Sequence, residues 1–170
     1  MFLQRAKFFL PILFLISLTK VFALDSDRDQ IMQLSADSAN FSQKDHKGIY
    51  TGHVSLIQGS THIRADNAIT EFSEKNKLKL AIINGTKTNQ AHYWADTEPN
   101  KAPVHAYADS IRYYPLNNKI ELIGHAKVVQ NGNSLSAAKI VYDTLKQQVI
   151  TESNKTMRTT LIFYPEKKST

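Results

Sequence analysis

The sequence predicts an all-β protein, and three observations lead to this fold class. Turn signals such as Asn84-Gly85 and Asn131-Gly132 recur roughly every 8–15 residues after residue 30. The segments between these turns, for example residues 49–57 and 139–142, are short and rich in β-branched and aromatic residues. No window of about 12 residues has a clear 3.6-residue apolar period, so no long amphipathic helix is expected.

Residues 1–23 have the organisation of an export signal. Arg5 and Lys7 precede an apolar run over residues 8–18, and Val21-Phe22-Ala23 offers a signal-peptidase site. The run is about 11 residues long, whereas a membrane-spanning helix needs roughly 20. We expect cleavage after Ala23 and a periplasmic protein, and an uncleaved N-terminal anchor is the alternative. Residues 24–165 would then form one domain and residues 166–170 a C-terminal tail.

The composition excludes several classes of protein. The 170 residues include no cysteine, which excludes disulfide scaffolds, zinc–cysteine sites, iron–sulfur clusters and cysteine nucleophiles. The formal net charge is +6, and half of this charge belongs to residues 1–23, the predicted leader. The remaining excess of positive charge is too small to indicate a nucleic-acid partner. The lysines and arginines are spread along turns and outer strand positions, which is typical of a solvated surface.

The sequence contains an internal duplication. When the chain is shifted by 72 residues, eight of the thirty positions between residues 36 and 65 are identical, with no gap. Such a repeat indicates supersecondary units that bury their apolar faces against their neighbours. The identical positions are Ala36-Asp37-Ser38 with Ala108-Asp109-Ser110, Lys47 with Lys119, Gly52-His53 with Gly124-His125, Gln58 with Gln130, and Ala65 with Ala137.

The repeat also indicates which face of each strand points inward. In four strand segments an alanine is followed by apolar or small residues three and five positions later. A regular strand keeps a period of two, so the step of three implies one extra residue after each alanine, which we interpret as a bulge or corner. Recurring aspartates are expected to cap these turns. The alanines are Ala36, Ala65, Ala108 and Ala137, and the aspartates are Asp37, Asp66, Asp109 and Asp143.

This rule and the alternation along each strand predict one long apolar stripe on the inner face, which we take as the ligand-binding surface. Its neighbours on the opposite face, such as Arg112, are expected to point outward. The stripe consists of Met32, Leu34, Ala36, Phe41, Tyr50, Val54, Leu56, Ile63, Ala65, Leu80, Ile82, Ala106, Ile111, Tyr113, Leu122, Val128, Leu135, Ile140 and Tyr142.

The sequence offers no motif for catalysis or metal binding. Of the six histidines, no two are four residues apart with a glutamate between them. His53 and His125 follow the repeated glycine and are expected on the outer face. Gly-x-Ser-x-Gly and glycine-rich phosphate loops are absent. We therefore expect no enzyme, no metal and no cofactor. A hydrolase with paired carboxylates stays open as an alternative, because such pairing is spatial.

Several strings resemble the OstA-like family of periplasmic lipopolysaccharide-transport proteins. They are residues 52–59 and 63–66 in the first half, and residues 104–113 and 120–126 in the second. The similarity covers roughly residues 29–165, although residues 86–101 depart from the family pattern. The resemblance implies an open, twisted antiparallel β-jelly roll of about sixteen strands, V-shaped in section. It implies that the slit between the sheets holds the acyl chains of lipopolysaccharide, and that the protein is neither an enzyme nor cofactor-dependent.

The resemblance also implies partners. They are lipopolysaccharide with its lipid A, an inner-membrane C component, the N-terminal domain of an outer-membrane D component, and further copies of the chain joined head to tail. The first strand is expected near residues 30–36 and the last near residues 157–164. Both are predicted edges whose free backbone groups can pair with another copy. The edge residues are Ile31, Leu34, Leu161 and Phe163.

Two other functions remain open from the sequence. One is the membrane-anchored C component of the same pathway, which would keep its N-terminal helix. The other is an unrelated periplasmic β-solenoid enzyme or glycan-binding protein.

Overall fold

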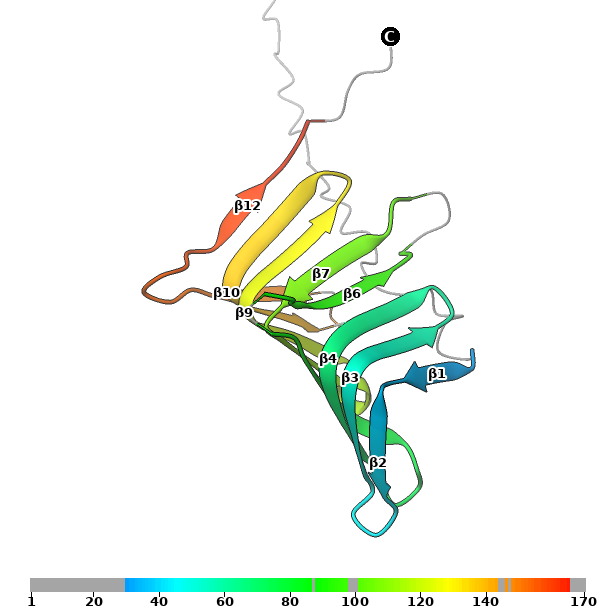
Figure 1. Ribbon diagram of the computed structural model, residues 1–170. Coiled ribbons are helices and arrows are strands. Elements are labelled where there is room, and N and C mark those ends of the chain that lie inside the picture. The colour runs from blue at the N-terminus through cyan, green and yellow to red at the C-terminus, as the bar shows by residue number, and fades with distance from the viewer. Residues whose placement is uncertain (1–29, 87, 98–100, 144–145, 147, 166–170) are drawn as a thin grey trace, which may run out of the picture.

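The computed structural model describes residues 30–86, 88–97, 101–143, 146 and 148–165. Within these residues the chain forms twelve β-strands and one short 3-10 segment, η2 (Pro115–Asn117), so the predicted all-β class is confirmed (Figure 1). In this part of the chain, no helix has the length and apolar character needed to span a membrane. The predicted leader and the C-terminal tail lie outside the described residues.

All neighbouring strands pair in the antiparallel sense. The strands are β1 (Met32–Ser35), β2 (Ser38–Ser42), β3 (Lys47–Gln58), β4 (Thr61–Phe72), β5 (Leu78–Asn84), β6 (Ala91–Ala95), β7 (Val104–Ala108), β8 (Ser110–Tyr114), β9 (Lys119–Gln130), β10 (Asn133–Asp143), β11 (Gln148–Glu152) and β12 (Thr160–Ile162).

The strands form two layers that share four long members, β3, β4, β9 and β10. The first layer has the order β1-β3-β4-β6-β7-β9-β10-β12, and the second has the order β2-β3-β4-β5-β8-β9-β10-β11. Figure 1 shows the long strands bending where they pass from one layer into the other. Counting each long strand once in each layer accounts for the about sixteen strands that the resemblance implies.

The bend is built by the repeated glycine and histidine. Gly52 and His53 both have positive φ, +78° and +44°, and together they face only the one residue between Ala65 and Asn67 on β4. This is a β-bulge, which bends and twists the strand that carries it. Gly124 and His125 repeat the same conformation in β9, with φ of +77° and +45°. The predicted corner is therefore confirmed: Ala65 and Ala68 on β4, and Ala137 and Ile140 on β10, are buried three residues apart, and the bulged glycine and histidine lie opposite this step on β3 and β9.

The aspartates of the two repeats hold these corners closed. The backbone N–H of Asp37 donates to the carbonyl of Gly52 at 2.9 Å, and that of Asp109 donates to Gly124 at the same distance. Asp143 is different from what was expected, because it lies at the end of β10 and accepts from the backbone N–H of Lys146 at 2.8 Å. It caps the turn after β10 and takes no part in a corner.

The core lies between the two layers. Along the corner it consists mainly of alanines, and the cross-strand pairs Ala91–Ala108 and Ala126–Ala137 are completely buried. Small side chains let the inner faces of the two layers approach closely here. Larger side chains such as Ile63, Tyr93 and Leu122 occupy the positions one step away from the corner. The interior is therefore a wedge, narrow along the corner and filled by larger groups farther from it.

Candidate functional site

The inner face of the first layer carries an apolar row that crosses every strand. Its members are directly opposite one another in consecutive strand pairs, so their side chains lie on the same face of the sheet. The row begins on the edge strand β1 and ends on the edge strand β12. Its residues are Leu34, Leu56, Ile63, Tyr93, Ala106, Val128, Leu135 and Leu161.

The second layer presents two such rows toward the first. One row is Ala39, Tyr50, Ala68, Ile83, Ile111, Leu122, Ile140 and Thr151. The other is Phe41, Gly48, Thr70, Ala81, Tyr113, Ile120, Tyr142 and Val149. Because the rows run across the strands, the apolar surface extends along the whole width of the sheet and does not form an isolated pocket.

A narrow cavity lies between the layers in the second half of the chain. Its accessible volume is about 60 Å³, well below the roughly 300–1,000 Å³ of a typical small-molecule pocket. The side chains that line it are aliphatic or aromatic, and they come from both layers. They are Tyr93, Val104, Ala106, Ile120, Leu122, Val128, Leu135, Ile140, Tyr142 and Val149. An elongated apolar ligand can enter only if the layers separate or these side chains rotate.

The corner histidines are on the outside, as expected. His53 Nδ1 lies 2.7 Å from Asp37 Oδ2, and His125 Nδ1 lies 2.8 Å from Asp109 Oδ2. The hydrogen bond and the charge of Asp37 raise the pKa of His53 above its usual value. Among the described residues, no group of three histidine or carboxylate side chains is placed to hold a metal ion. These pairs brace the corner, and nothing in their geometry links them to the slit.

Comparison with known proteins shows which family has this architecture. The family of LptA and the LptD N-terminal domain, described as LPS transport proteins, matches residues 33–148. The chain belongs to this family. Lipopolysaccharide export system protein LptH from Pseudomonas aeruginosa is 36% identical over 86% of this chain and 86% of its own length. Lipopolysaccharide export system protein LptA from Escherichia coli is 25% identical, over 85% of this chain and 76% of its own.

A solved structure shows the same fold. It is the crystal structure of LptH, described as the LptA-homologous periplasmic component of the conserved lipopolysaccharide transport device of Pseudomonas aeruginosa. The two structures superpose with a TM-score of 0.73 at 30% identity, covering 82% of this chain and 99% of LptH. The OstA-like resemblance and the predicted open β-jelly roll are thereby confirmed.

Most residues of the predicted stripe do lie on the inner faces. Eight of them are buried: Val54, Ile63, Ala65, Ala106, Ile111, Leu122, Ile140 and Tyr142. Six more are partly buried and pack against this core: Ala36, Tyr50, Leu56, Tyr113, Val128 and Leu135. Leu34, Met32 and Phe41 are on the edge strands β1 and β2, where Met32 is 44% and Phe41 is 55% exposed. Their binding of a ligand stays a prediction.

Two predicted residues of the stripe are on the wrong face. In β5 the buried residues are Ala81 and Ile83, which lie opposite Thr70 and Ala68 of β4. Leu80 and Ile82 alternate with them and therefore point outward. Residues 80–83 are an uninterrupted apolar run, so the sequence of this strand does not distinguish its two faces. Only the pairing with β4 sets the register.

Strand β6 is not among the strands that the sequence predicts. It lies within residues 86–101, the segment that departs from the family pattern, and it contributes Tyr93 to the slit. The signal was present, because Ala91, Tyr93 and Ala95 are buried and alternate with half-buried His92 and Trp94. A run of five residues is short for such a pattern to be decisive.

Proposed function

We propose that this protein is a periplasmic lipopolysaccharide carrier. In this role it shields the acyl chains of lipid A in the slit between its layers and passes lipopolysaccharide from the inner toward the outer membrane. The observation that carries the proposal is the set of continuous apolar rows on both inner faces, which extend from one edge strand to the other. The names of the relatives, which describe lipopolysaccharide export, support the same conclusion.

The energetics suit a carrier. Each buried methylene stabilises the complex by roughly 0.8 kcal/mol relative to its exposure to water, so even partial burial of a few acyl chains gives useful affinity. The cavity between the layers has only about 60 Å³, so the layers must move apart to admit a chain and can return when it leaves. A wide surface that tolerates sliding, in place of a deep and tightly fitting pocket, allows the lipid to be handed on.

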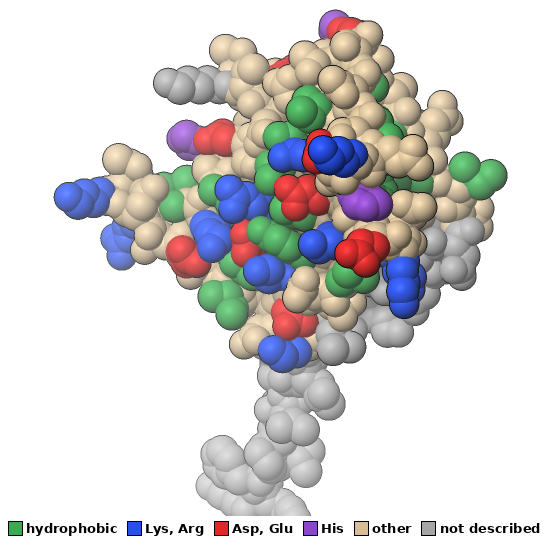
Figure 2. All heavy atoms as spheres, turned by 90° about the horizontal axis from the view of Figure 1, so that it is seen from below, with side chains coloured by type: hydrophobic (Ala, Val, Ile, Leu, Met, Phe, Trp, Pro, Cys, Tyr) green, Lys and Arg blue, Asp and Glu red, His purple; other side chains and the backbone are tan. Residues whose placement is uncertain are grey.

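Charge has a minor part in this proposal. On the face shown in Figure 2, lysine and arginine side chains are interspersed with aspartate and glutamate, and hydrophobic side chains lie between them. Several charged side chains of the protein are paired across strands, as in Lys47–Glu71 and Lys139–Glu152. Exposed pairs of this kind contribute little binding energy, so we assign the affinity to acyl burial.

A photo-crosslinking experiment on β8 tests the slit. Tyr113 lies on an inner apolar row and packs against the core, whereas its neighbour Arg112 is exposed on the outer face. A photoreactive residue at position 113 should label bound lipopolysaccharide, and the same residue at position 112 should not. The two positions differ in the face of β8 on which they lie, so equal labelling at both would contradict binding of the lipid in the slit.

The same proposal includes assembly and partners. The first-layer row ends in Leu34 on β1 and Leu161 on β12, so pairing of β12 with β1 of another copy would continue the apolar surface without interruption. We propose such head-to-tail contacts, and equivalent contacts with an inner-membrane C component and with the N-terminal domain of an outer-membrane D component. Pairing of a strand onto an exposed edge is a general mode of recognition.

Export and processing complete the proposal. Cleavage after Ala23 would yield a protein free in the periplasm, whereas retention of residues 1–23 would favour the anchored C component. The mass of the exported protein distinguishes the two. The family names describe transport proteins, and we propose no catalytic activity.

A further inference from the structure

Aromatic and histidine rings form a stack on the outer face of the first layer. The rings of His62 and Trp94 are 4.8 Å apart, those of Trp94 and His92 are 4.6 Å apart, and those of His92 and Tyr107 are 4.3 Å apart. The planes of these three pairs are 3°, 28° and 8° apart. The stack crosses β4, β6 and β7, and on β7 it includes both Tyr107 and His105. It lies on the face opposite the slit, because the alternate residues Ala91, Tyr93 and Ala106 are the buried ones.

A broad hollow opens beside the ring of Tyr107. It has a volume of about 560 Å³ and is lined by Tyr107, His92, Gln90, Asp109 and His125, together with Thr88 and Asn89. A second hollow of about 430 Å³ shares Tyr107 and Gln90 with the first and is bordered by Lys127. The residues common to both are thus an aromatic ring and an amide, with acidic and basic side chains at the margins.

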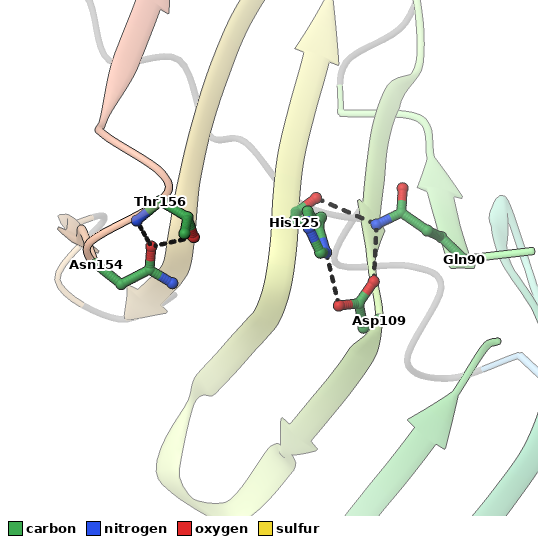
Figure 3. A network of polar contacts seen from close by, with 5 residues as sticks. All are labelled: Gln90, Asp109, His125, Asn154 and Thr156. Carbon is green, nitrogen blue, oxygen red and sulfur yellow. Dashed lines mark hydrogen bonds and ion pairs between the residues drawn. The ribbon is translucent and has the colours of Figure 1, made fainter. Parts of the chain in front are cut away.

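The Gln90 side chain is fixed in this hollow by its neighbours. Its Nε2 donates to Asp109 Oδ1 at 3.3 Å and to the carbonyl of His125 at 3.2 Å, and His125 in turn contacts Asp109 Oδ2. Figure 3 shows the amide oxygen of Gln90 pointing away from both partners. The amide is therefore held in place by its nitrogen while its oxygen stays available to accept a hydrogen bond.

The internal duplication shows that these groups are not required to build the corner. The first repeat forms the same corner, with the same Asp37–His53 contact and the same glycine conformation. However, the position equivalent to Tyr107 is Ser35, and the position equivalent to Lys127 is Ser55. The ring and the cation are thus additions of the second half, and folding of the corner does not explain them.

We propose that the hollow around Tyr107 and Gln90 binds a saccharide unit that carries an acidic substituent. The apolar C–H face of a pyranose packs against an aromatic ring, and its hydroxyls need planar acceptors and donors at the ring edge. Tyr107 supplies the aromatic ring, and Gln90 Oε1 and the exposed ring of His125 supply the hydrogen-bonding groups. Lys127, exposed at the margin, is placed to attract a carboxylate or phosphate on the sugar.

This site is separate from the lipid slit. Its residues point away from the apolar rows, so it can be occupied whether or not an acyl chain is bound. An acidic saccharide could come from the sugar portion of lipopolysaccharide or from the glycan strands of the cell wall. The two sources share the chemistry that the hollow recognises, and two separate probes distinguish them.

The test is a nuclear magnetic resonance titration of the purified protein with two probes. One is the core oligosaccharide released from lipopolysaccharide, which has no acyl chains, and the other is muramidase-solubilised cell-wall glycan. At least one probe should shift the signals of the Gln90 side-chain amide and the Tyr107 and Lys127 backbone amides. Tyr107→Phe should keep the affinity, whereas Tyr107→Ala should lower it about tenfold. His53→Ala, a change at the corner of the first repeat and away from the hollow, should leave the affinity unchanged.

Two results would overturn the proposal. One is that neither probe shifts these signals, and the other is that Tyr107→Ala binds as tightly as the wild type. Lys127 is exposed, so Lys127→Ala should keep the fold. Because salt screens the lysine charge, this variant should weaken binding most at low salt. Lipid labelling from position 113 should be the same in the wild type and in Lys127→Ala. Failure of the saccharide site is therefore distinguishable from failure of the carrier function.

Discussion

At the scale of single residues, the molecule depends on a few backbone positions that are repeated in its two halves. Gly52 and Gly124 have φ near +78°, a conformation that only glycine adopts without strain, and a Cβ at either would collide with the carboxylate of Asp37 or Asp109. The aspartate can approach the chain so closely because no side chain is present. The corner is therefore specified by the glycine and the aspartate together.

Replacing Gly124 with alanine should destabilise the protein by about 2–3 kcal/mol, because the substitution adds both left-handed strain and the collision with Asp109. Gly132→Ala is the matched control, since Gly132 has a similar φ of +81° but its added Cβ would meet only the ring of Tyr164, at an ordinary 3.4 Å. Urea unfolding of the two variants measures the difference. Equal losses would show that the contact with the aspartate is unimportant.

Two histidines should give opposite pH dependences of stability. Burial, then His105 and Arg64, lower the pKa of His92 from 6.5 to about 4, so folding favours its neutral form. The unfolding free energy should therefore fall as the pH drops from about 6.5 to 4, by on the order of 1 kcal/mol because solvent screens the half-buried ring. His92→Gln should remove this dependence in urea unfolding at several pH values, and an unchanged pH profile in the variant would contradict it.

For His53 the sign is reversed. Asp37 raises its pKa, so the pair stabilises the fold below pH 6.5 and loses this contribution as the pH rises through the elevated pKa. His53→Ala, compared with the wild type by the same method, should therefore lose stability at low pH and little at high pH.

At the scale of elements, the two ends of the sheet determine how the protein can assemble. In the described part of the chain, β1 and β2 each pair on one side only, as do β11 and β12. Ile31 is 91% and Phe163 is 74% exposed beside these edges, and β12 contains no proline or charge. Such edges template pairing with another strand. A contact between the last strand and the first is heterologous and does not close, so it would build a rod.

Deleting residues 157–170 should abolish concentration-dependent oligomers, while the rest stays folded and still binds lipid. β10 then becomes the edge, but it lacks the exposed apolar side chains of Leu161 and Phe163. Deleting residues 166–170 alone leaves β12 in place and is the control. Analytical ultracentrifugation over a range of concentrations measures the effect, and assembly of the longer deletion as in the wild type would exclude pairing through β12.

At the scale of the whole molecule, the two layers form a wedge that joins along the corner. Alanines close the wedge at the corner, and larger apolar groups fill it farther out, around a small cavity. The two layers cannot slide past each other easily, because the four long strands run through both layers and their register is set by pairing in each. Opening by a change of bend at the four long strands disturbs fewer hydrogen bonds, so we expect lipid to enter by separation of the layers.

If acyl burial dominates binding, salt should affect capture of lipopolysaccharide only slightly. Raising the ionic strength from about 0.1 to 1 M shortens the Debye length from about 10 to 3 Å and screens exposed charges. We expect the affinity to fall by less than about threefold, measured by fluorescence displacement. Complete release at moderate salt would show that the head group, and not the slit, carries the binding.

The sequence by itself determined the all-β class, the 72-residue repeat, the corner and most of the inner face. These features follow from local chemistry: alternation sets the face of a strand, and the step of three after each repeated alanine indicates a corner. The sequence did not determine the face of residues 80–83 or the presence of β6, because an apolar run or a five-residue strand is ambiguous without its partner. Only the pairing of β5 with β4, and of β6 with β4 and β7, resolves them. The tertiary structure alone also brought Gln90, Tyr107 and His125 together on the outer face, since their proximity depends on strands that are distant in sequence.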